Sequence, residues 1–338
     1  MAARPRRELI DESRVGTYHC FVQAMRQAFL IGRSFEDGKD YTHRQAWVRD
    51  RVEALGSVFS IDVVDYAAMS NHMHLILRNR PDVLATWSDE EVVRRWLLLN
   101  RHTLRLRRPP TESKVKETLK NKRRVAKLRK RLSSISWFMA YLNQPIANAA
   151  NDEDEKTGHF WADRFGSVEL EDEEARLACI LYVDLNRVRA GEARAPEEAK
   201  NTAIHDRVRD WIERNADHPN AGWLAPLSIK GDGYLGAAAR RRASDLGVLR
   251  MTEEEYLEYL DTCGRAKVPG KRGWIPSELP PILERLQLSA SRWEDAVRTM
   301  TARFDRIQRK ADEQADRRSP NRRADEPDGE VSPPAGGN

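Results

Sequence analysis

Two histidines, His72 and His74, stand two residues apart in the stretch Asn-His-Met-His-Leu-Ile-Leu. Met73, Leu75 and Leu77 alternate with them, which is the pattern of a β-strand with a side-chain period of two. On such a strand both imidazoles point to one face, where their ring nitrogens can hold one divalent metal ion. The same pattern also fits a strand with two polar residues on its solvent-facing side.

A second group of candidate residues lies in the segment Tyr-Val-Asp-Leu-Asn, where Tyr182 and Asn186 are four residues apart and share one helix face. If this face meets the histidine strand, His72, His74 and the amide oxygen of Asn186 form a neutral three-ligand site. Such a site suits Mg²⁺ or Mn²⁺ when a substrate phosphate supplies negative charge. The metal would polarise the phosphate, and the Tyr182 hydroxyl could attack it as a nucleophile. From the residues alone, Tyr182 is also typical of an aromatic at the edge of a core.

The elements that must position these residues begin with a strand over Val15–Gln23 and a helix over Tyr41–Leu55. Strands over Ile61–Ala68 and Met73–Leu77 follow, joined at Ser70-Asn71. This order is the start of a ferredoxin-like (split βαβ) unit with an antiparallel sheet, so we predict an α+β fold.

The second half of this unit is expected to be a core helix, a short strand and the tyrosine helix. The core helix covers Ser133–Ala150, with Pro145 as a kink or break. A strand over Ser167–Leu170 leads into a helix over Asp172–Asn186, which Gly191 would end.

Three further segments complete the predicted domain organisation. Residues 1–195 form the catalytic domain, with a helical basic insertion at about 81–132. Residues 196–309 form a mainly helical C-terminal region. Residues 310–338 contain scarcely any apolar side chain, which predicts a disordered tail.

Composition narrows the class of protein. Net charge is +5 and pI about 9.1, and residues 101–131 hold fourteen Lys or Arg against two Glu. This stretch could bind a polyanion or form a solvated helical arm. Three distant cysteines without a CxxC pair argue against a zinc finger or a disulfide framework and fit a reducing cytoplasm. We expect no signal peptide and no membrane span, because no apolar run follows the basic start and none approaches 18 residues.

Several motifs then occur in a fixed order. They are Ala-Arg-Pro-Arg-Arg near the start, Tyr18-His19, Asn71-His72-Met73-His74-Leu75, Phe160-Trp161 with Arg164-Phe165, and the stretch Tyr-Val-Asp-Leu-Asn-Arg-Val-Arg-Ala-Gly from Tyr182 to Gly191. This set resembles the REP-associated tyrosine transposases, which belong to the single-tyrosine HUH endonuclease superfamily of insertion-sequence transposases. The resemblance covers roughly residues 4–195 without the insertion.

The resemblance implies a fold and a chemistry. His72 and His74 match the His-hydrophobic-His motif of that superfamily, Tyr182 falls where the family has its nucleophile, and Asn186 where its third metal ligand is expected. The family cleaves single-stranded DNA, often folded as a hairpin, leaving a 5′-phosphotyrosine and a free 3′-hydroxyl, and the reverse reaction joins strands. Relatives act as monomers or as homodimers that share active sites. This chain has Arg187 where the family usually has proline, which leaves the end of the helix open.

Candidate DNA contacts lie outside the motif residues as well as within them. Arg164 could contact a phosphate or cap the strand that follows it. The basic stretch could grip a DNA backbone through Arg123, Arg124, Lys127 and Lys130. Two other functions remain open: a DNA-binding regulator that no longer cuts, and a phosphodiesterase in which water replaces the tyrosine.

Overall fold

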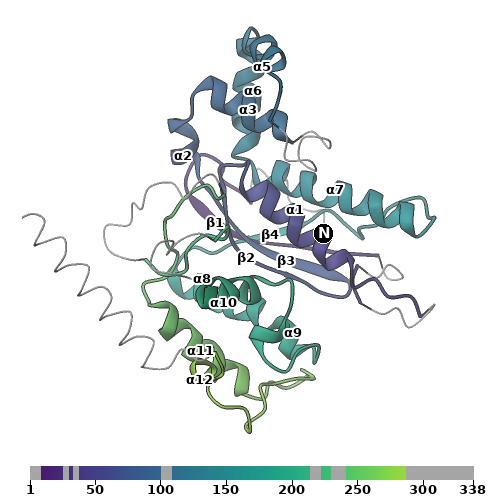
Figure 1. The fold of residues 1–338 in the computed structure, drawn as a ribbon, viewed down its shortest axis with the longest axis vertical. Coiled ribbons are helices and arrows are strands. Elements are labelled where there is room, and N and C mark those ends of the chain that lie inside the picture. Colours follow the sequence, from purple (N-terminus) through teal and green to yellow (C-terminus); the bar gives the residue numbers. More distant parts are fainter. Residues whose placement is uncertain are drawn as a thin grey trace, which may run out of the picture. The chain divides into compact units, whose positions relative to one another are not determined.

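In the computed structural model, four antiparallel strands form one sheet in the order β2-β3-β1-β4 (Figure 1). Their bounds are β1 Gly16–Gln23, β2 Ile61–Ala68, β3 His72–Asn79 and β4 Gly166–Glu169. The mixed α+β prediction with an antiparallel sheet is therefore confirmed, and β2 has the predicted bounds.

The structure describes residues 9–25, 30–32, 38–99, 109–213, 222–229 and 241–286. All of them belong to the compact unit Met1–Leu286, and the second unit is Gln287–Asn338. The predicted tail and the first part of the basic stretch, residues 101–108, lie outside the described residues. The domain division proposed at residue 195 remains a prediction.

One face of the sheet carries the main apolar core. Cys20 of β1 and Met73 and Leu75 of β3 are fully buried there. Helices α1 (Arg44–Gly56) and α7 (Ile135–Glu153) cover this face and pack against each other (Figure 1). The alternation of apolar side chains along the strands is what buries them together on this side.

Helix α7 differs from the prediction at Pro145, which lies inside an unbroken helix. Of the two outcomes expected at Pro145, the break is therefore wrong and the kink stays a prediction. The buried side chains Leu142 and Ile146 on either side of the proline hold both halves of the helix in the core. This packing offsets the backbone hydrogen bond that proline cannot make.

The opposite face of the sheet carries the histidines of β3 and is covered by α8 (Glu173–Asp184) and α10 (Ala203–Glu213). Figure 1 shows these two helices on the other side of the sheet from α1 and α7. A short helix, α9 (Asn186–Arg189), and the 3₁₀ turn η2 (Pro196–Glu198) join them. The helix packing thus leaves the tyrosine helix and the histidine strand in contact.

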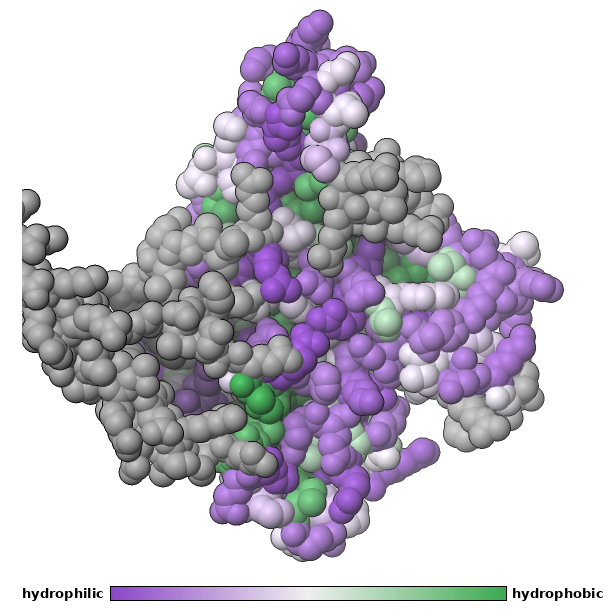
Figure 2. Space-filling view, viewed as in Figure 1, coloured by the Kyte–Doolittle hydropathy of each residue, from purple (hydrophilic) through white to green (hydrophobic). Residues whose placement is uncertain are grey.

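The predicted insertion is helical in its described part. It contains α2 (Pro81–Thr86), α3 (Asp89–Leu98), α5 (Glu112–Leu119) and α6 (Lys122–Leu132), of which α3, α5 and α6 pack together. Val93, Val115 and Leu128 are buried between them. Ser88 and Asn121 cap α3 and α6 by accepting backbone N–H bonds. The face shown in Figure 2 is mainly hydrophilic over these helices.

Beyond residue 240 the chain returns to the sheet and then to the tyrosine helix. The buried guanidinium of Arg78 donates to Asp62 and to the carbonyl oxygen of Gly247. Helix α11 (Glu253–Arg265) begins with a capping box at Thr252 and contacts α12 (Ile282–Arg285). No helix in the described ranges is long and apolar enough to cross a membrane.

Candidate active site

The two histidines of β3 lie in the middle of the sheet. His74 faces Phe21 of β1 and Ala67 of β2 across the ladder, and His72 faces Gln23. His74 is buried and His72 is half-buried. Both imidazoles therefore lie on one face of the strand, as the period of two predicts.

In each of these two imidazoles, the Nδ1 atom has a hydrogen-bond partner and the Nε2 atom has none among the described residues. The Nδ1 atom of His74 lies 3.0 Å from Nε2 of His19, and Nδ1 of His72 lies 2.7 Å from Oδ1 of Asn71. His74 Nε2 is buried and has no hydrogen-bond partner within the described residues. When Nδ1 carries the proton, Nε2 carries the lone pair, which is the arrangement of metal-binding histidines.

Burial keeps these imidazoles neutral. Desolvation, with smaller contributions from the charges of His72, His19 and Lys271, lowers the pKa of His74 to about 3. Desolvation followed by the charge of Lys271 lowers the pKa of His72, and desolvation lowers that of His19. A neutral imidazole can offer its lone pair to a metal without first losing a proton.

Tyr182 lies directly beside this histidine cluster. It projects from α8, which begins where Asp172 caps the helix and where Glu173 and Glu174 face the positive end of the macrodipole. The Tyr182 ring stands edge-on to His74, with ring centres 5.4 Å apart, and the side chain is 46% exposed. The ring thus touches the candidate metal site while its hydroxyl group can be reached from solvent.

The tyrosine helix ends earlier than predicted. Leu185 is the C-cap of α8, because its N–H bonds to the carbonyls of Leu181 and Val183, and Asn186 starts the short helix α9. The prediction of one continuous helix over Tyr182 and Asn186 is therefore wrong.

Asn186 is buried on this side of the sheet, and its Nδ2 atom has no hydrogen-bond partner among the described residues. Within the same residues, no three imidazole, thiol or carboxylate groups are arranged to hold a metal ion. A metal at His72 and His74 would need an amide, a carbonyl or a substrate oxygen as its next ligand. The free Nε2 of His74 suits such a site. Asn186 would have to contribute its Oδ1 atom, because the unpartnered Nδ2 is a hydrogen-bond donor, so its role as a ligand stays a prediction.

The predicted DNA contacts on α6 share one helix face. Measured around α6, Arg123, Lys127 and Lys130 fall within about 60°, and Arg124 adjoins them at about 100° from Arg123. All four side chains are exposed, and none forms an ion pair with another described residue. The face is therefore free to meet an anion, although its role remains a prediction.

Two other cations of α6 behave differently. Lys122 and Arg129 both pair with Asp89 at the start of α3, each at 3.1 Å. These two ion pairs join α6 to α3. The paired cations of α6 therefore lie on a different side of the helix from the unpaired ones.

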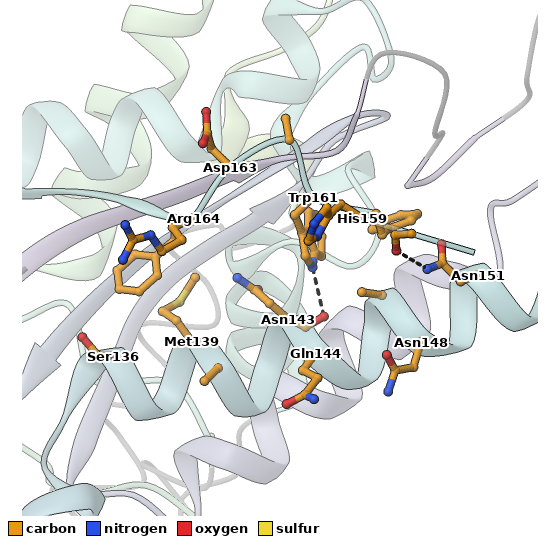
Figure 3. Close-up of a pocket in the computed structure, with 16 residues that line it drawn as sticks. Ser136, Met139, Asn143, Gln144, Asn148, Asn151, His159, Trp161, Asp163 and Arg164 are labelled. Atoms are coloured by element: carbon orange, nitrogen blue, oxygen red, sulfur yellow. Dashed lines mark hydrogen bonds between the residues drawn. The ribbon is translucent and has the colours of Figure 1, made fainter. Parts of the chain in front are cut away.

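Arg164 lies away from the histidines, in a depression of about 590 Å³ between α7 and the loop 158–165 (Figure 3). The indole of Trp161 forms one wall and donates to the carbonyl of Asn143. The Asn151 amide donates to Gly158 in the same loop. Because α7 covers the other face of the sheet, the structure does not bring Arg164 into the cluster of His74 and Tyr182.

Two residues near the site were not among the predicted catalytic or metal-binding residues. His19 reads as a structural strand residue, yet it bonds to His74 and stands edge-on to Tyr182 with ring centres 6.4 Å apart. The positive charge of Lys271 lowers the pKa of both His72 and His74, although nearly 200 residues separate Lys271 from them in the sequence. His19 shares the strand parity of Phe21, but only the pairing register, Phe21 opposite His74, shows that it meets His74.

Comparison with known proteins gives one distant likeness. No family model and no curated protein matches the chain. A solved structure described as "Structure of the REP associates tyrosine transposase bound to a REP hairpin" is similar, with 13% sequence identity and a TM-score of 0.36. The similarity covers 70% of this chain and 96% of that one. It is a distant structural relationship and does not establish the family.

Proposed function

We propose that this protein is an HUH-type tyrosine transposase, a nickase and strand transferase for single-stranded DNA that acts through Tyr182. The observation that carries the proposal is the contact of the Tyr182 ring with His74, whose Nε2 atom has no partner among the described residues. A nucleophile next to a potential metal ligand is what phosphodiester cleavage through a covalent intermediate requires. The ordered motifs in the sequence point to the same chemistry.

The fold belongs to this proposal as well. We assign the sheet to the ferredoxin-like split βαβ class. The strand order β2-β3-β1-β4 and the position of α1 and α7 on one face support that assignment. In this arrangement β3 lies between two neighbours, so the histidine pair sits on a rigid central strand.

The residues present suit a divalent metal, Mg²⁺ or Mn²⁺, held by His72, His74 and Asn186. When bound, it would polarise the phosphate and neutralise charge that develops on it. His19 and Asn71 contact the Nδ1 atoms of the two imidazoles, so the Nε2 atoms are the ones that would hold the metal. The imidazoles stay neutral, so the site depends on the substrate for negative charge.

The reaction forms one bond and breaks one. The Tyr182 oxygen bonds to phosphorus while the bond from phosphorus to the 3′-oxygen breaks, and the phenol proton leaves as the 3′-oxygen gains one. The product is a 5′-phosphotyrosine and a free 3′-hydroxyl. Attack by a 3′-hydroxyl reverses these steps and joins strands, with no external energy source.

DNA is the expected partner, single-stranded or folded as a hairpin. The unpaired basic face of α6, formed by Arg123, Arg124, Lys127 and Lys130, supports a contact with the phosphate backbone. Arg164 adds a further cation at the depression beside α7.

A denaturing gel tests the proposal. The protein is incubated with labelled single-stranded hairpin DNA from repeats that flank its gene, with Mg²⁺, Mn²⁺ or a chelator. We expect a covalent protein–DNA band that needs the metal and is absent from Tyr182→Phe. The matched control is Tyr259→Phe, because Tyr259 is similarly exposed, at 51%, but lies on α11. Cleavage that survives Tyr182→Phe would favour the hydrolase, and binding without cleavage would favour the regulator.

A further inference from the structure

A short basic loop follows α11, with the sequence Val-Pro-Gly-Lys-Arg-Gly from Val268 to Gly273. We call these six residues the basic loop. Gly270 has a φ of 77°, a left-handed conformation that other residues rarely adopt. The N–H of Lys271 donates to the carbonyl of Val268 at 3.1 Å, which closes a tight turn with Lys271 at its end.

The basic loop is fixed to α9, the helix that begins with Asn186. The backbone N–H groups of Arg272 and Gly273 both donate to the carbonyl of Arg189, at 3.1 and 3.3 Å. In return, the Arg189 guanidinium donates to the carbonyls of Cys263 and Ala266, just before the loop. These reciprocal bonds hold the loop against the C-terminal end of α9, three residues beyond Asn186.

Gly273 shows how closely the two segments approach. A Cβ atom at this position would lie 2.0 Å from the carbonyl oxygen of Val188 and 3.1 Å from Gly191. Since both neighbours are backbone atoms, neither can move aside without displacing α9. Only glycine allows the basic loop to lie here.

Lys271 is the cation that this placement brings to the histidines. Its side chain is exposed, and it forms no ion pair with a described residue. Its positive charge contributes to the low pKa of both His72 and His74, and it is the only described lysine or arginine that affects either group. Lys267, four residues earlier, instead lies over the ring of Trp274, 4.6 Å from its centre.

A cation beside two neutral imidazoles makes the candidate site electropositive before any metal arrives. Adding a divalent cation would increase the repulsion, because charges in a partly buried site are weakly screened. A phosphodiester between Lys271 and a divalent cation would balance both positive charges, since a lysine ammonium is a strong donor to phosphate oxygens. The positive charge at this site is therefore balanced only when an anion binds.

We propose that the basic loop is a phosphate subsite of the candidate active site, in which Lys271 contacts the DNA backbone next to the linkage that Tyr182 attacks. This inference rests on the proposed function and extends it to the C-terminal region, which supplies a substrate-binding residue. Lys271 binds the substrate anion and does not hold the metal.

The test compares Lys271→Met with Lys267→Met, both in full-length protein that also carries Tyr182→Phe, so that no turnover occurs. Binding of a labelled single-stranded 30-nucleotide DNA of mixed sequence is measured by anisotropy with Mn²⁺. We expect Lys271→Met to weaken binding roughly tenfold, since a hydrogen bond from an ammonium group to a phosphate oxygen is charge-assisted and among the strong ones. The slope of log affinity against log salt should become shallower by about 0.7, the value for one phosphate of a single strand.

A second readout separates a direct contact from a structural role. Mn²⁺ affinity without DNA should be unchanged or higher in Lys271→Met, because a neighbouring positive charge is removed. In the parent protein, which carries only Tyr182→Phe and keeps both lysines, acetylation followed by mass spectrometry should show that DNA protects Lys271 and does not protect Lys267. Equal DNA binding by both variants, or a parallel loss of Mn²⁺ and DNA affinity in Lys271→Met, would overturn the proposal. If Lys271→Met weakens DNA binding but Tyr182 of the unmodified protein forms no adduct with DNA, the phosphate subsite stands and only the proposed cleavage chemistry is rejected.

Discussion

At the scale of single residues, the candidate site depends on His19 as well as on the two motif histidines. His19 lies 3.0 Å from His74 through ring nitrogens and stacks on it with ring centres 5.1 Å apart. It is therefore a positioning residue, which holds the orientation of the His74 ring. Partners of this kind control metal affinity without touching the metal.

We expect His19→Ala to lower the Mn²⁺ affinity of the protein by about 10- to 100-fold, the usual effect of removing such a partner. His74→Ala should lower it at least as much. The measurement is isothermal titration calorimetry without DNA. His159→Ala is the control, because His159 lies in the loop beside α7 and outside the cluster. Unchanged Mn²⁺ affinity in His19→Ala would show that His74 does not need this partner.

The low pKa of His74 has a consequence for pH dependence. An imidazole binds a metal only when neutral, so affinity falls as pH drops through its pKa. With the pKa of His74 at about 3 and that of His72 below its usual value, we expect Mn²⁺ affinity to be nearly constant from about pH 8 to 6.5. A fall centred on about pH 6.5, typical of free imidazole, would contradict the burial of the pair. Calorimetry across this range measures it.

At the scale of elements, α6 divides its cations between packing and solvent. We expect the replacement of Arg123, Arg124, Lys127 and Lys130 by Gln to reduce the salt dependence of single-strand binding by about 0.7 for each phosphate that the helix no longer binds. Anisotropy at several salt concentrations measures this slope.

The two paired cations of α6 provide the control. Replacing Lys122 and Arg129 by Gln removes ion pairs with Asp89 and should affect the stability of the α3–α6 packing more than the slope. The two replacements lie on different sides of one helix. An equal slope in both variants and in the unmodified protein would show that α6 is a solvated arm.

A buried pair of carboxyl groups links β2 to α8. Asp65 and Asp184 are both fully buried, and burial raises the pKa of each, that of Asp184 to about 6. The charge of Asp184 raises the pKa of Asp65 further, so Asp65 is the carboxyl that holds a proton. Tyr256 donates to Asp184, and the charge of buried Arg207 favours the ionised form of both carboxyls.

This pair should make the protein less stable as pH rises. Because the folded state keeps protons that the unfolded chain has released, its contribution is present below the ordinary carboxyl pKa of 3.8 and is lost as pH rises through about 6. The loss is of the order of 3 kcal/mol. Asp65→Asn, whose neutral amide replaces the protonated carboxyl, should flatten the decline in the free energy of unfolding between about pH 4 and 6.5. Urea titration measures it, with exposed Asp50→Asn as control; an unchanged pH dependence in Asp65→Asn would refute a protonated Asp65.

Much of this element structure follows from the sequence, and the exceptions have physical reasons. Period-two alternation predicts β3, because each face of a strand has a single environment, and an apolar run beside a polar turn predicts β2. Alternation does not determine register between strands that are distant in sequence, so the contact of His19 with His74 is visible only in the fold. The end of α8 at Leu185 was missed because no proline or glycine marks it.

At the scale of the whole molecule, the region after residue 195 is joined to the sheet by buried polar contacts. The guanidinium of Arg207 donates to backbone carbonyls of Val64 and Ala225, and Tyr256 donates to Asp184. Sequence patterns could predict helices here but not their partners, because single buried polar contacts leave no periodic signal.

We therefore expect a chain truncated after residue 195 to lack a cooperative thermal transition, whereas one truncated after Leu286 retains it. Removal of α10 exposes the apolar surface of β2 and leaves Asp184 and Asp65 without Arg207. Circular dichroism on heating compares the two. A cooperative transition in the shorter chain would show that the sheet domain folds alone.

The central claim is that Tyr182 becomes covalently attached to DNA. The most direct measurement is mass spectrometry of the protein after reaction with hairpin DNA and Mn²⁺, followed by nuclease and protease digestion. We predict a nucleotide linked through phosphate to the peptide that contains Tyr182, and none on exposed Tyr259. Cleaved DNA with no modified tyrosine, or a nucleotide on another residue, would contradict the account.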